Sequence, residues 1–448
     1  MARYAILCPE AGGHLFPMGS LGLELRQRGH TVTVVALAKA APIVEQLGLL
    51  FHELPKEARS LFRPHPWPLW LATRLLGLRS VFGLRLAFVW RAAYLLEYAP
   101  AILRQLGVDA LLIDQGVLAA STVAEHLGLP CISVCSALHW LGEPDIPPQF
   151  TGWSAATGRW PRWRNRVGYA FWHWYVQPAM KLINSRRRTW GLAPLACVDS
   201  TYSPLATLAQ SCPELDYPRA CLPDTFHYVG SLGADRPCNT STFPWDRLDG
   251  RPLIYASMGT VRPNQKPVVF RRIAEACCGL GAQLVISTGK WERNEHHGEA
   301  EPLVLPGDPL VLPFVPQPAL LDRAHLVITH AGQNTVAESL AHGVPMVATP
   351  HGCDQPAMAA RVERAGVGLR TDSRWPSARD LREKVERVLG EESFRQRAEL
   401  LQEAMLAAGG VGRAADIAEQ ACETGQPVLR NGAAGLGGEA RPVRARPQ

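Results

Sequence analysis

Short apolar runs alternate with amphipathic stretches from the first residues of this chain. Residues 4–8 are apolar, residues 9–14 are mostly small and polar, residues 17–28 have helical periodicity, and residues 31–36 are apolar again. Gly29 is a favourable end for that helix, because glycine readily adopts the left-handed conformation that follows helices. The pattern predicts strand, loop, helix and strand, which is the repeating unit of a parallel α/β sheet.

The alternation continues in two series, separated by a Pro-rich, irregular stretch at about residues 215–252. In the first series we expect strands at 110–113 and 131–134 with a helix at 117–127 between them. In the second we expect strands beginning at 253 and near 283–287, 310–313, 326–329 and 345–348, and helices over 379–423. The tail from 425 to 448 is rich in Gly, Ala, Pro and Arg, a composition typical of disorder.

Length and composition fit a globular enzyme of two or three domains. The 448 residues are 47% hydrophobic and 19% charged, and the net charge of +6 is modest. Eleven cysteines, with no C-x-x-C pair, favour reduced thiols in a cytosol over a disulfide framework. The start of the chain reads as a first strand rather than a signal peptide, and without a long uncharged apolar run we expect no transmembrane helix.

The stretch from 314 to 355 carries the strongest functional signal. The predicted strand 326–328 runs into Thr-His-Ala-Gly at 329–332, and a helix follows. Such a turn directs free backbone N–H groups and the helix dipole at an anion, and His330 can add a donor or a positive charge. Glu338 lies one helical turn after Asn334, so both can face one ligand. The segment therefore predicts a site for a molecule that carries phosphate and a polyol.

This stretch closely resembles the donor signature of the UDP-glycosyltransferases of GT-B fold. The family pattern is an aromatic residue and Gln, then T-H-x-G-x-N-[ST]-x-x-E, G-V-P and D-Q. The matching residues are Phe314, Gln317, His330, Gly332, Asn334, Thr335, Glu338, Gly343, Val344, Pro345, Asp354 and Gln355. Plant members have tryptophan in place of Phe314 and of Gln333. The likeness covers most of residues 1–423, thinly over 55–105 and 145–200.

The resemblance implies two facing Rossmann-like domains with doubly wound parallel sheets. We expect an acceptor-binding domain at 1–230 and a nucleotide-sugar domain at 231–411. Residues 412–424 are expected to form a helix that crosses back to the first domain, before the tail at 425–448. Ligands in such sheets bind beyond the carboxyl ends of the strands, so the two substrates would meet between the domains.

Glycosyl transfer to an alcohol needs a base, and His14 is the candidate. It follows Gly12-Gly13 after the first strand, where family members carry a catalytic histidine, and an imidazole is largely neutral at pH 7. A capping or buried structural histidine is the alternative. Asp114, at the end of the strand 110–113, would orient His14 and stabilise the imidazolium, as in the family. Its alternative role is a helix N-cap.

The resemblance also assigns the donor contacts. His330, Gly332 and the N–H groups near Asn334 and Thr335 would hold the diphosphate, which must be stabilised as it leaves. Gly259 and Thr260, in the Ser-Met-Gly-Thr turn at 257–260, would assist, although Gly-Thr turns are common by themselves. A base would stack on Phe314 near Gln317, Glu338 would bind the ribose unless it is only a solvated helix residue, and Asp354 and Gln355 would bind the sugar hydroxyls.

We expect neither a metal nor another cofactor, only a UDP-sugar as co-substrate. The chain has no D-x-D pair of the kind that holds a divalent ion in glycosyltransferases of the other common fold. His296 and His297 lie among Glu292, Glu295 and Glu299, which could indicate a metal cluster but also fits a polar surface loop.

Two stretches combine tryptophan with basic residues. Residues 151–190 hold six Trp and eight Arg or Lys with no Asp or Glu, and residues 62–98 interleave Arg and Trp with many Leu. This composition favours a peripheral contact with the inner face of a membrane and a lipophilic acceptor. An apolar acceptor pocket with an Arg-rich outer face fits equally. No nucleic-acid motif supports RNA binding.

The sequence thus predicts a cytoplasmic, inverting glycosyltransferase that moves a hexose, with glucose favoured, from UDP to a hydroxyl of a lipophilic small molecule. Stretches at 215–219, 226–230 and 249–253 most resemble carotenoid glucosyltransferases, although they lie outside the acceptor region. A non-catalytic UDP-sugar-binding partner and a sugar-nucleotide epimerase on the same fold are the alternatives. His14 and Asp114 argue against the first, and the absence of a carboxylate cluster against the second.

Overall fold

The structure is a computed structural model that describes residues 1–55, 79–234, 236, 238, 240–260, 267–289, 304–373 and 375–430. Several features of the sequence lie outside those residues. They are the first part of the basic and aromatic stretch at 62–98, the His296–His297 pair with its neighbouring glutamates, and the tail beyond residue 430.

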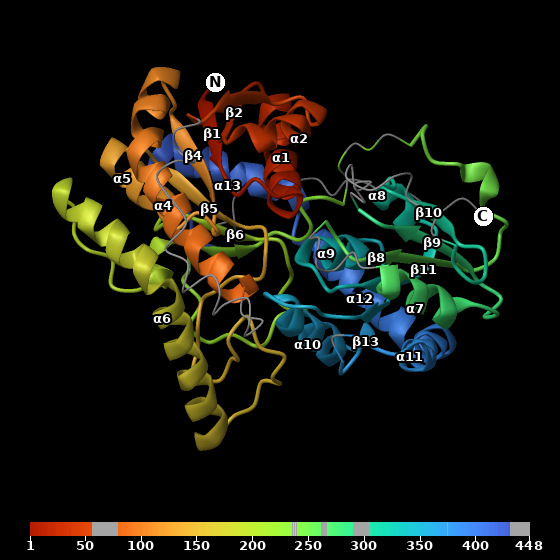
Figure 1. Cartoon of the computed structure of the whole chain (residues 1–448). Helices are drawn as coiled ribbons and strands as arrows, with labels where there is room; N and C mark the ends of the chain where they lie inside the picture. The colour runs from red at the N-terminus through yellow and green to blue at the C-terminus, as the bar shows by residue number, and fades with distance from the viewer. Residues whose placement is uncertain are drawn as a thin grey trace.

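The N-terminal half of the described chain forms a parallel sheet of seven strands, at the left of Figure 1. Its order is β3-β2-β1-β4-β5-β6-β7, with the first strand in the middle. The strands are β1 Arg3–Leu7, β2 Thr31–Ala36, β3 Leu50–Glu53, β4 Ala110–Asp114, β5 Cys131–Cys135, β6 Thr207–Ala209 and β7 Phe226–Tyr228. Because β1 and β4 are direct neighbours, the residues that follow them lie at the same edge of the sheet.

The C-terminal half repeats the plan with six parallel strands in the described residues, in the order β10-β9-β8-β11-β12-β13. They are β8 Leu253–Ser257, β9 Gln283–Ser287, β10 Leu310–Leu312, β11 Ala324–Thr329, β12 Met346–Ala348 and β13 Gly368–Arg370. The neighbours β8 and β11 pair in register from Ile254 and Leu326 to Ser257 and Thr329. The turns after these two strands therefore meet.

Helices cover both faces of each sheet (Figure 1). In the first domain they are α1 Gly12–Gln27, α2 Ala41–Gln46, α4 Arg79–Leu106, α5 Ala120–Leu127 and α6 Arg159–Thr189. In the second they are α7 Pro267–Cys277, α8 Gln317–Leu321, α9 Gln333–Ala341, α10 Gln355–Ala365, α11 Ala378–Gly390 and α12 Glu392–Ala407, with α13 Gly410–Thr424 at the end. Strand β1 illustrates the layering, since Tyr4 and Ile6 enter one buried cluster while Ala5 and Leu7 enter another.

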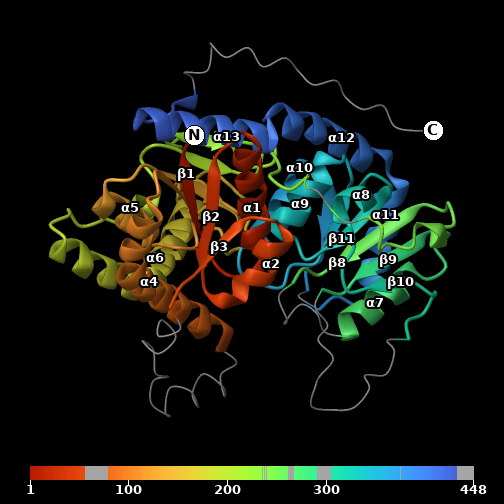
Figure 2. The ribbon, with the colours of Figure 1, turned by 90° about the horizontal axis from the view of Figure 1, so that it is seen from above.

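Helix α13 returns from the second domain to pack on α1 of the first. Figure 2 shows α12 and α13 running along the same side of the molecule, α12 over the second domain and α13 over the first. Arg28, just after α1, donates hydrogen bonds of 2.7 Å to both Asp416 and Glu419 of α13. These ion pairs and the buried alanines of α13 tie the end of the described chain to the first domain.

Three local predictions were wrong in detail. The first helix begins at Gly12 rather than 17, so His14 lies in its first turn and not in a loop. The stretch 215–252 contains β7, which completes the first sheet. The helix expected at 117–127 begins at Ala120, because a turn follows Asp114.

The long helices α4 and α6 pack against each other beside the first sheet. Among the described helices, the Gly83–Leu106 part of α4 is long and apolar enough to cross a membrane by length and composition. Half of its apolar window is buried inside the protein, which is also the property of a core helix.

Candidate active site

His14 and Asp114 lie in contact at the carboxyl edge of the first sheet. Asp114 is the last residue of β4, and His14 stands in the first turn of the helix that follows β1. Nδ1 of His14 is 3.0 Å from Oδ2 of Asp114. The Asp114 side chain is fully buried, whereas that of His14 is 28% exposed. With Nδ1 turned to the carboxylate, Nε2 is the ring nitrogen left for a substrate proton.

Two further groups hold this pair. The Ser136 hydroxyl, just after β5, donates a hydrogen bond to Oδ2 of Asp114 and lies 2.7 Å from Nδ1 of His14. The backbone N–H of Gly116 donates to Oδ1 of Asp114 over 2.6 Å. Ser136 was not predicted, although it also follows a strand at the same edge.

The charges of the pair stabilise each other. Burial lowers the pKa of His14, but the charge and hydrogen bond of Asp114 outweigh it, so the pKa is raised above its ordinary value. Burial alone would raise the pKa of Asp114, but His14, Ser136 and Gly116 together lower it. An ionised Asp114 beside an imidazole that accepts a proton readily is the electrostatic arrangement of a general base.

In the second domain, His330 lies between two glycines. A Cβ atom on Gly259 would lie 2.6 Å from Cε1 of His330, and one on Gly332 would lie 2.3 Å from Nε2. Gly259 and Ala331 also have left-handed backbone conformations, with φ of 70° and 61°. Such a conformation is unfavourable for alanine and marks a turn fixed by its surroundings. Thr260, at the end of the glycine turn, is exposed.

His330 is a neutral side chain at pH 7. Burial lowers its pKa to about 4. Of the two possibilities considered from the sequence, a hydrogen-bond donor and a positive charge, the environment favours the donor. His330 stands two residues before Gly332, the N-cap residue of α9. The imidazole and the first N–H groups of that helix are thus available to one anion.

Glu338 is deeply buried in α9 and held from two sides. Its Oε1 accepts a hydrogen bond of 2.6 Å from Arg236, and its Oε2 accepts one of 2.6 Å from Gln317. Tyr255 in turn donates to Gln317 over 2.9 Å. Burial raises the pKa of Glu338, although Arg236 and Gln317 act against it. The solvated helix face considered from the sequence is therefore wrong for Glu338.

The remaining predicted donor residues lie at the start of α9, before α8 and at the start of α10. Thr335 is buried at the start of α9, and Phe314, which precedes α8, leaves half of its surface exposed. Gln355 begins α10, and its Oε1 accepts hydrogen bonds from the N–H groups of His351 and Gly352. Asp354 stands just before that helix in the same turn.

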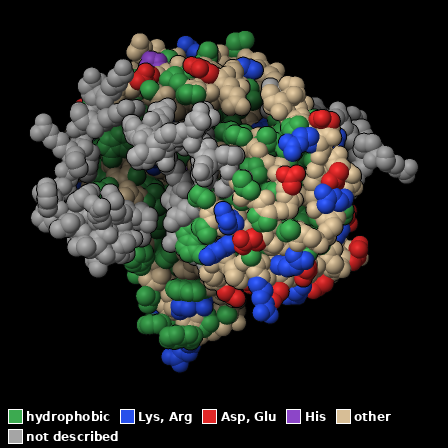
Figure 3. Space-filling view, turned by 45° about the vertical axis from the view of Figure 1, so that its right-hand side comes forward, with side chains coloured by type: hydrophobic (Ala, Val, Ile, Leu, Met, Phe, Trp, Pro, Cys, Tyr) green, Lys and Arg blue, Asp and Glu red, His purple; other side chains and the backbone are tan. Residues whose placement is uncertain are grey.

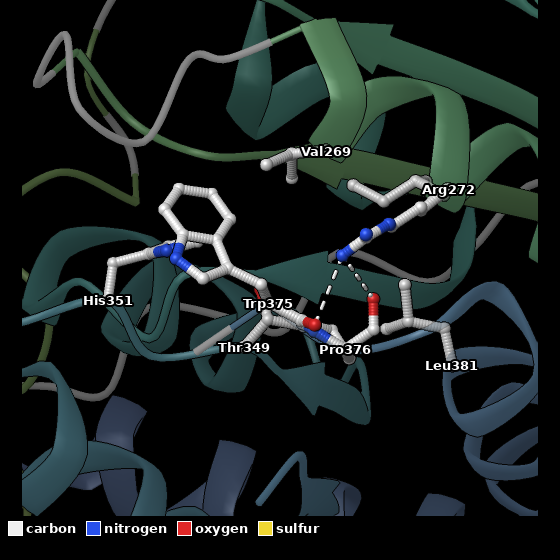
Figure 4. A pocket seen from close by; sticks show the side chains of 8 residues that line it. Val269, Arg272, Thr349, His351, Trp375, Pro376 and Leu381 are labelled. Carbon is white, nitrogen blue, oxygen red and sulfur yellow. Dashed lines mark hydrogen bonds between the residues drawn. The ribbon is translucent and has the colours of Figure 1, made fainter. Parts of the chain in front are cut away.

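The turn that leads to Asp354 packs over a small cavity (Figure 4). The ring centroids of His351 and Trp375 are 4.8 Å apart, and Arg272 donates hydrogen bonds of 3.1 and 3.2 Å to the carbonyl oxygens of Trp375 and Pro376. None of the predicted donor residues lines this cavity.

Contacts across the domain boundary bring the two sets of residues together. The Asn334 amide donates to the carbonyl oxygen of Gly13 over 2.8 Å, and its oxygen accepts from Gln210 over 2.6 Å. The carboxylate of Asp354 accepts from the N–H of Leu138 over 3.1 Å. Asp354 also contributes to raising the pKa of His14. The predicted base therefore faces the predicted sugar-binding residues.

Metal-binding groups are scarce in the described part of the chain. No group of three or more His, Cys, Asp or Glu side chains there could hold a metal ion. None of the cysteines in the described part of the chain is joined in a disulfide.

Known proteins are similar to this chain in sequence and in architecture. The family model described as "UDP-glucoronosyl and UDP-glucosyl transferase" matches residues 190–404. A zeaxanthin glucosyltransferase of Pseudescherichia vulneris is 34% identical over 431 residues, covering 96% of this chain and 100% of that protein. This chain belongs to the UDP-glycosyltransferase family. A zeaxanthin glucosyltransferase of Pantoea ananas is 32% identical over 96% of this glycosyltransferase and 98% of the relative.

Solved structures confirm the predicted GT-B fold. CalG4, the calicheamicin glycosyltransferase, has a TM-score of 0.69 at 20% identity, covering 95% of this chain and 100% of that one. The kitacinnamycin glycosyltransferase has a TM-score of 0.68 at 22% identity, covering 94% and 98%. The predictions of an enzyme, of its glycosyltransferase class and of a nucleotide-sugar donor are confirmed by the family.

Proposed function

We propose that this glycosyltransferase transfers glucose from UDP-glucose to a hydroxyl group of a carotenoid-like lipophilic acceptor, with inversion at the sugar carbon. The contact between His14 and Asp114, facing Asp354 across the domain boundary, carries the proposal. The two relatives named zeaxanthin glucosyltransferase, matched over nearly their whole lengths, support the sugar and the acceptor class.

In the proposed step, Nε2 of His14 takes the proton of the acceptor hydroxyl. The oxygen attacks the anomeric carbon from the side opposite the diphosphate, and the bond from that carbon to the diphosphate oxygen breaks. The transition state has oxocarbenium character, and charge builds on the leaving group. Asp114 stabilises the imidazolium, while His330 and the N-terminus of α9 stabilise the departing UDP.

The donor contacts follow from the same arrangement. Glu338, buried in α9, would bind the ribose hydroxyls, and Phe314 would stack on the base. Asp354 and Gln355 would bind the hydroxyls of the sugar. We propose that the reaction needs no metal ion, and that the neutral His330 and the first N–H groups of α9 bind the diphosphate instead.

The test is incubation of the protein with UDP-glucose and zeaxanthin, with UDP release and the glycoside mass as readouts. The configuration of the new bond, read by NMR, decides inversion. His14→Ala should abolish transfer but retain UDP binding by calorimetry. Full transfer by His14→Ala would remove the assigned base. UDP binding without transfer to any hydroxylated acceptor would favour the non-catalytic partner, and conversion of the UDP-sugar itself would favour the epimerase.

A further inference from the structure

Helix α6 presents a stripe of large apolar side chains to solvent along the first half of its length. Members of the stripe are spaced three or four residues apart, which places them on one side of the helix. They are Trp160, Trp163, Val167, Phe171 and Trp174, and each is between 45% and 68% exposed. The rings of Trp160 and Trp163 stack with their centroids 5.0 Å apart. This α6 stripe runs for about 20 Å at the usual rise of a helix.

A neighbouring side of α6 is already used by the core. Trp172, Tyr175 and Ala179 are buried in a cluster that includes Phe88 of α4. The exposed stripe is therefore not the surface by which α6 packs on the protein, because other residues of the helix make that contact. Figure 1 shows the first half of α6 projecting from the body of the molecule. A large apolar patch left open on a projecting element indicates a contact surface.

The charges around the stripe are all positive on this helix. Residues 159–189 contain eight Arg or Lys and no Asp or Glu. Arg159 and Arg166 are exposed beside the stripe, and no ion pair joins either of them to another described residue. Arg85 of α4 lies over the Trp174 ring at 4.1 Å. Figure 3 shows hydrophobic and basic side chains together at the protruding lower end of the molecule.

The same side of α6 continues into a groove beyond Trp174. Gln177, Lys181 and Arg188 line it at helical spacing, and it has a volume of about 650 Å³. Met180 and Leu195 add apolar lining. The groove thus extends the combination of apolar surface and cations along the second half of the helix.

The loop that follows Ser136 connects the proposed base to this helix. Ser136, which touches His14, begins the loop that ends where α6 starts at Arg159. In that loop, Trp140 packs edge-on against Trp172 of α6, with ring centroids 5.1 Å apart. Trp172 is the immediate neighbour of the exposed Phe171. The aromatic cluster that contains Trp140 and Trp172 therefore joins α6 to the loop that begins beside the proposed base.

We propose that the α6 stripe and its flanking cations dock on an anionic lipid bilayer, from which the enzyme takes its acceptor. Tryptophan favours the boundary between water and acyl chains, and the arginines would lie among the anionic headgroups. A second copy of the chain fits poorly, because a symmetric contact would oppose arginine to arginine. The docking stands on its own, while the acceptor delivery rests on the proposed function.

Co-sedimentation with phosphatidylcholine vesicles, with and without phosphatidylglycerol, tests the docking. The protein should bind the anionic vesicles at low salt and dissociate from them as the salt concentration rises. Trp160→Gln with Trp163→Gln should weaken binding at least about tenfold. Arg159→Gln with Arg166→Gln should weaken it about 30-fold, because each basic group near an anionic surface contributes roughly fivefold. Leu400→Gln with Leu406→Gln, equally exposed on α12 at 53% each, is the matched control and should bind normally.

Activity separates the two proposals. The Trp160/Trp163 variant should glycosylate a water-soluble phenol at the normal rate but lose most transfer to zeaxanthin embedded in the vesicles. No vesicle binding at low salt, or binding that both α6 variants retain, overturns the docking. Loss of a dimer in those variants without vesicle binding overturns it too and makes the stripe a self-interface. Vesicle binding with no transfer from UDP-glucose to any acceptor leaves the docking intact and overturns the proposed function.

Discussion

The side-chain amide of Asn334 donates a hydrogen bond to the carbonyl oxygen of Gly13, which has no N–H donor within its own helix. In an α-helix that oxygen accepts from the N–H four residues on, but residue 17 is a proline within α1. Because this N–H is missing, the Gly13 oxygen, one residue before the proposed base, remains available as an acceptor. Asn334, from the predicted nucleotide-sugar site of the second domain, donates the hydrogen bond instead.

Pro17→Ala should uncouple the two domains at this point. The new N–H would compete for the Gly13 oxygen, and Asn334 would lose a hydrogen bond of about 1 kcal/mol. We expect kcat to fall several-fold while the free energy of unfolding does not decrease, because alanine is the better helix residue. Steady-state kinetics and urea unfolding measure the two effects. Pro100→Ala, a buried proline within α4, is the control, and an equal effect of both variants on kcat would contradict the coupling.

The pH profile should depend on Asp114. Because the pKa of His14 is raised and a base must be neutral, kcat/KM should rise as pH increases through that raised value. Asp114→Asn should lower kcat about 10²- to 10⁴-fold and move the acid limb of the profile to lower pH. Arg91, which lowers the pKa of His14, and Asp354, which raises it, remain in the variant. An acid limb that does not move would mean that another group titrates.

The same pair affects stability with a defined sign. A raised pKa in the folded protein means that protonated His14 adds stability below its unfolded pKa of about 6.5, and the gain is lost as pH rises through the folded value. Asp114→Asn should remove this dependence. Unfolding in urea at several pH values checks it, with His14→Ala as the reference.

The strands and the donor motif were predictable because their signals are local. Apolar runs of strand length, ended by glycine or proline, mark β8, β9 and β11, and the residues of the motif lie within 314–355. Sequence order does not reveal that β1 and β4 are neighbours, because β2 and β3 come between them in the chain. The contact of His14 with Asp114 was expected from the family resemblance.

Other site residues have no local pattern to reveal them. Gln210 and Asn334 are 124 residues apart, and Arg236 reaches Glu338 from the segment that links the domains. Their roles depend on how two separately built domains meet. Helix α6 was not predicted because Pro161, Pro178 and many aromatic residues weaken its helical pattern. Pro161 is tolerated in the first turn, where no N–H has an intrahelical partner, and packing on α4 stabilises the rest.

Glu338→Gln should weaken donor binding more than it slows the chemical step. The carboxylate would make charge-assisted hydrogen bonds to the ribose, each worth about 1.5–3 kcal/mol. We therefore expect KM for UDP-glucose to rise about 10- to 100-fold with a much smaller change in kcat. Arg236, which holds Glu338 in the structure, would have to share it with the ribose. Glu386→Gln, on the exposed side of α11, is the control; equal KM values for both variants would remove Glu338 from the donor site.

A buried ionic cluster around Asp216 joins the two domains, and we expect it to determine the stability of the protein at acidic pH. Asp216 accepts hydrogen bonds from Arg219 and Tyr228 of its own domain and from Arg361 of α10, at 2.8 to 3.0 Å. It lies in the 215–219 stretch that resembles carotenoid glucosyltransferases, and this cluster gives that stretch a structural role. Burial alone would raise its pKa, but Arg361 and His139 hold it well below the usual range.

Asp216→Asn should destabilise the protein by about 3–5 kcal/mol, because it leaves buried arginines without a counter-charge. His139 makes the stability depend on pH, because burial, together with the smaller effect of the Arg219 charge, lowers its pKa to about 4. Between these pH values His139 binds a proton in the unfolded chain but not in the folded protein. The free energy of unfolding should therefore fall as pH drops from about 6.5 toward 4. Urea unfolding across that range measures both effects, and His139→Gln should flatten the slope. Asp145→Asn, which breaks an exposed pair with Arg162, should change little. If Asp216→Asn were equally mild, the cluster would not be what joins α10 to the first domain.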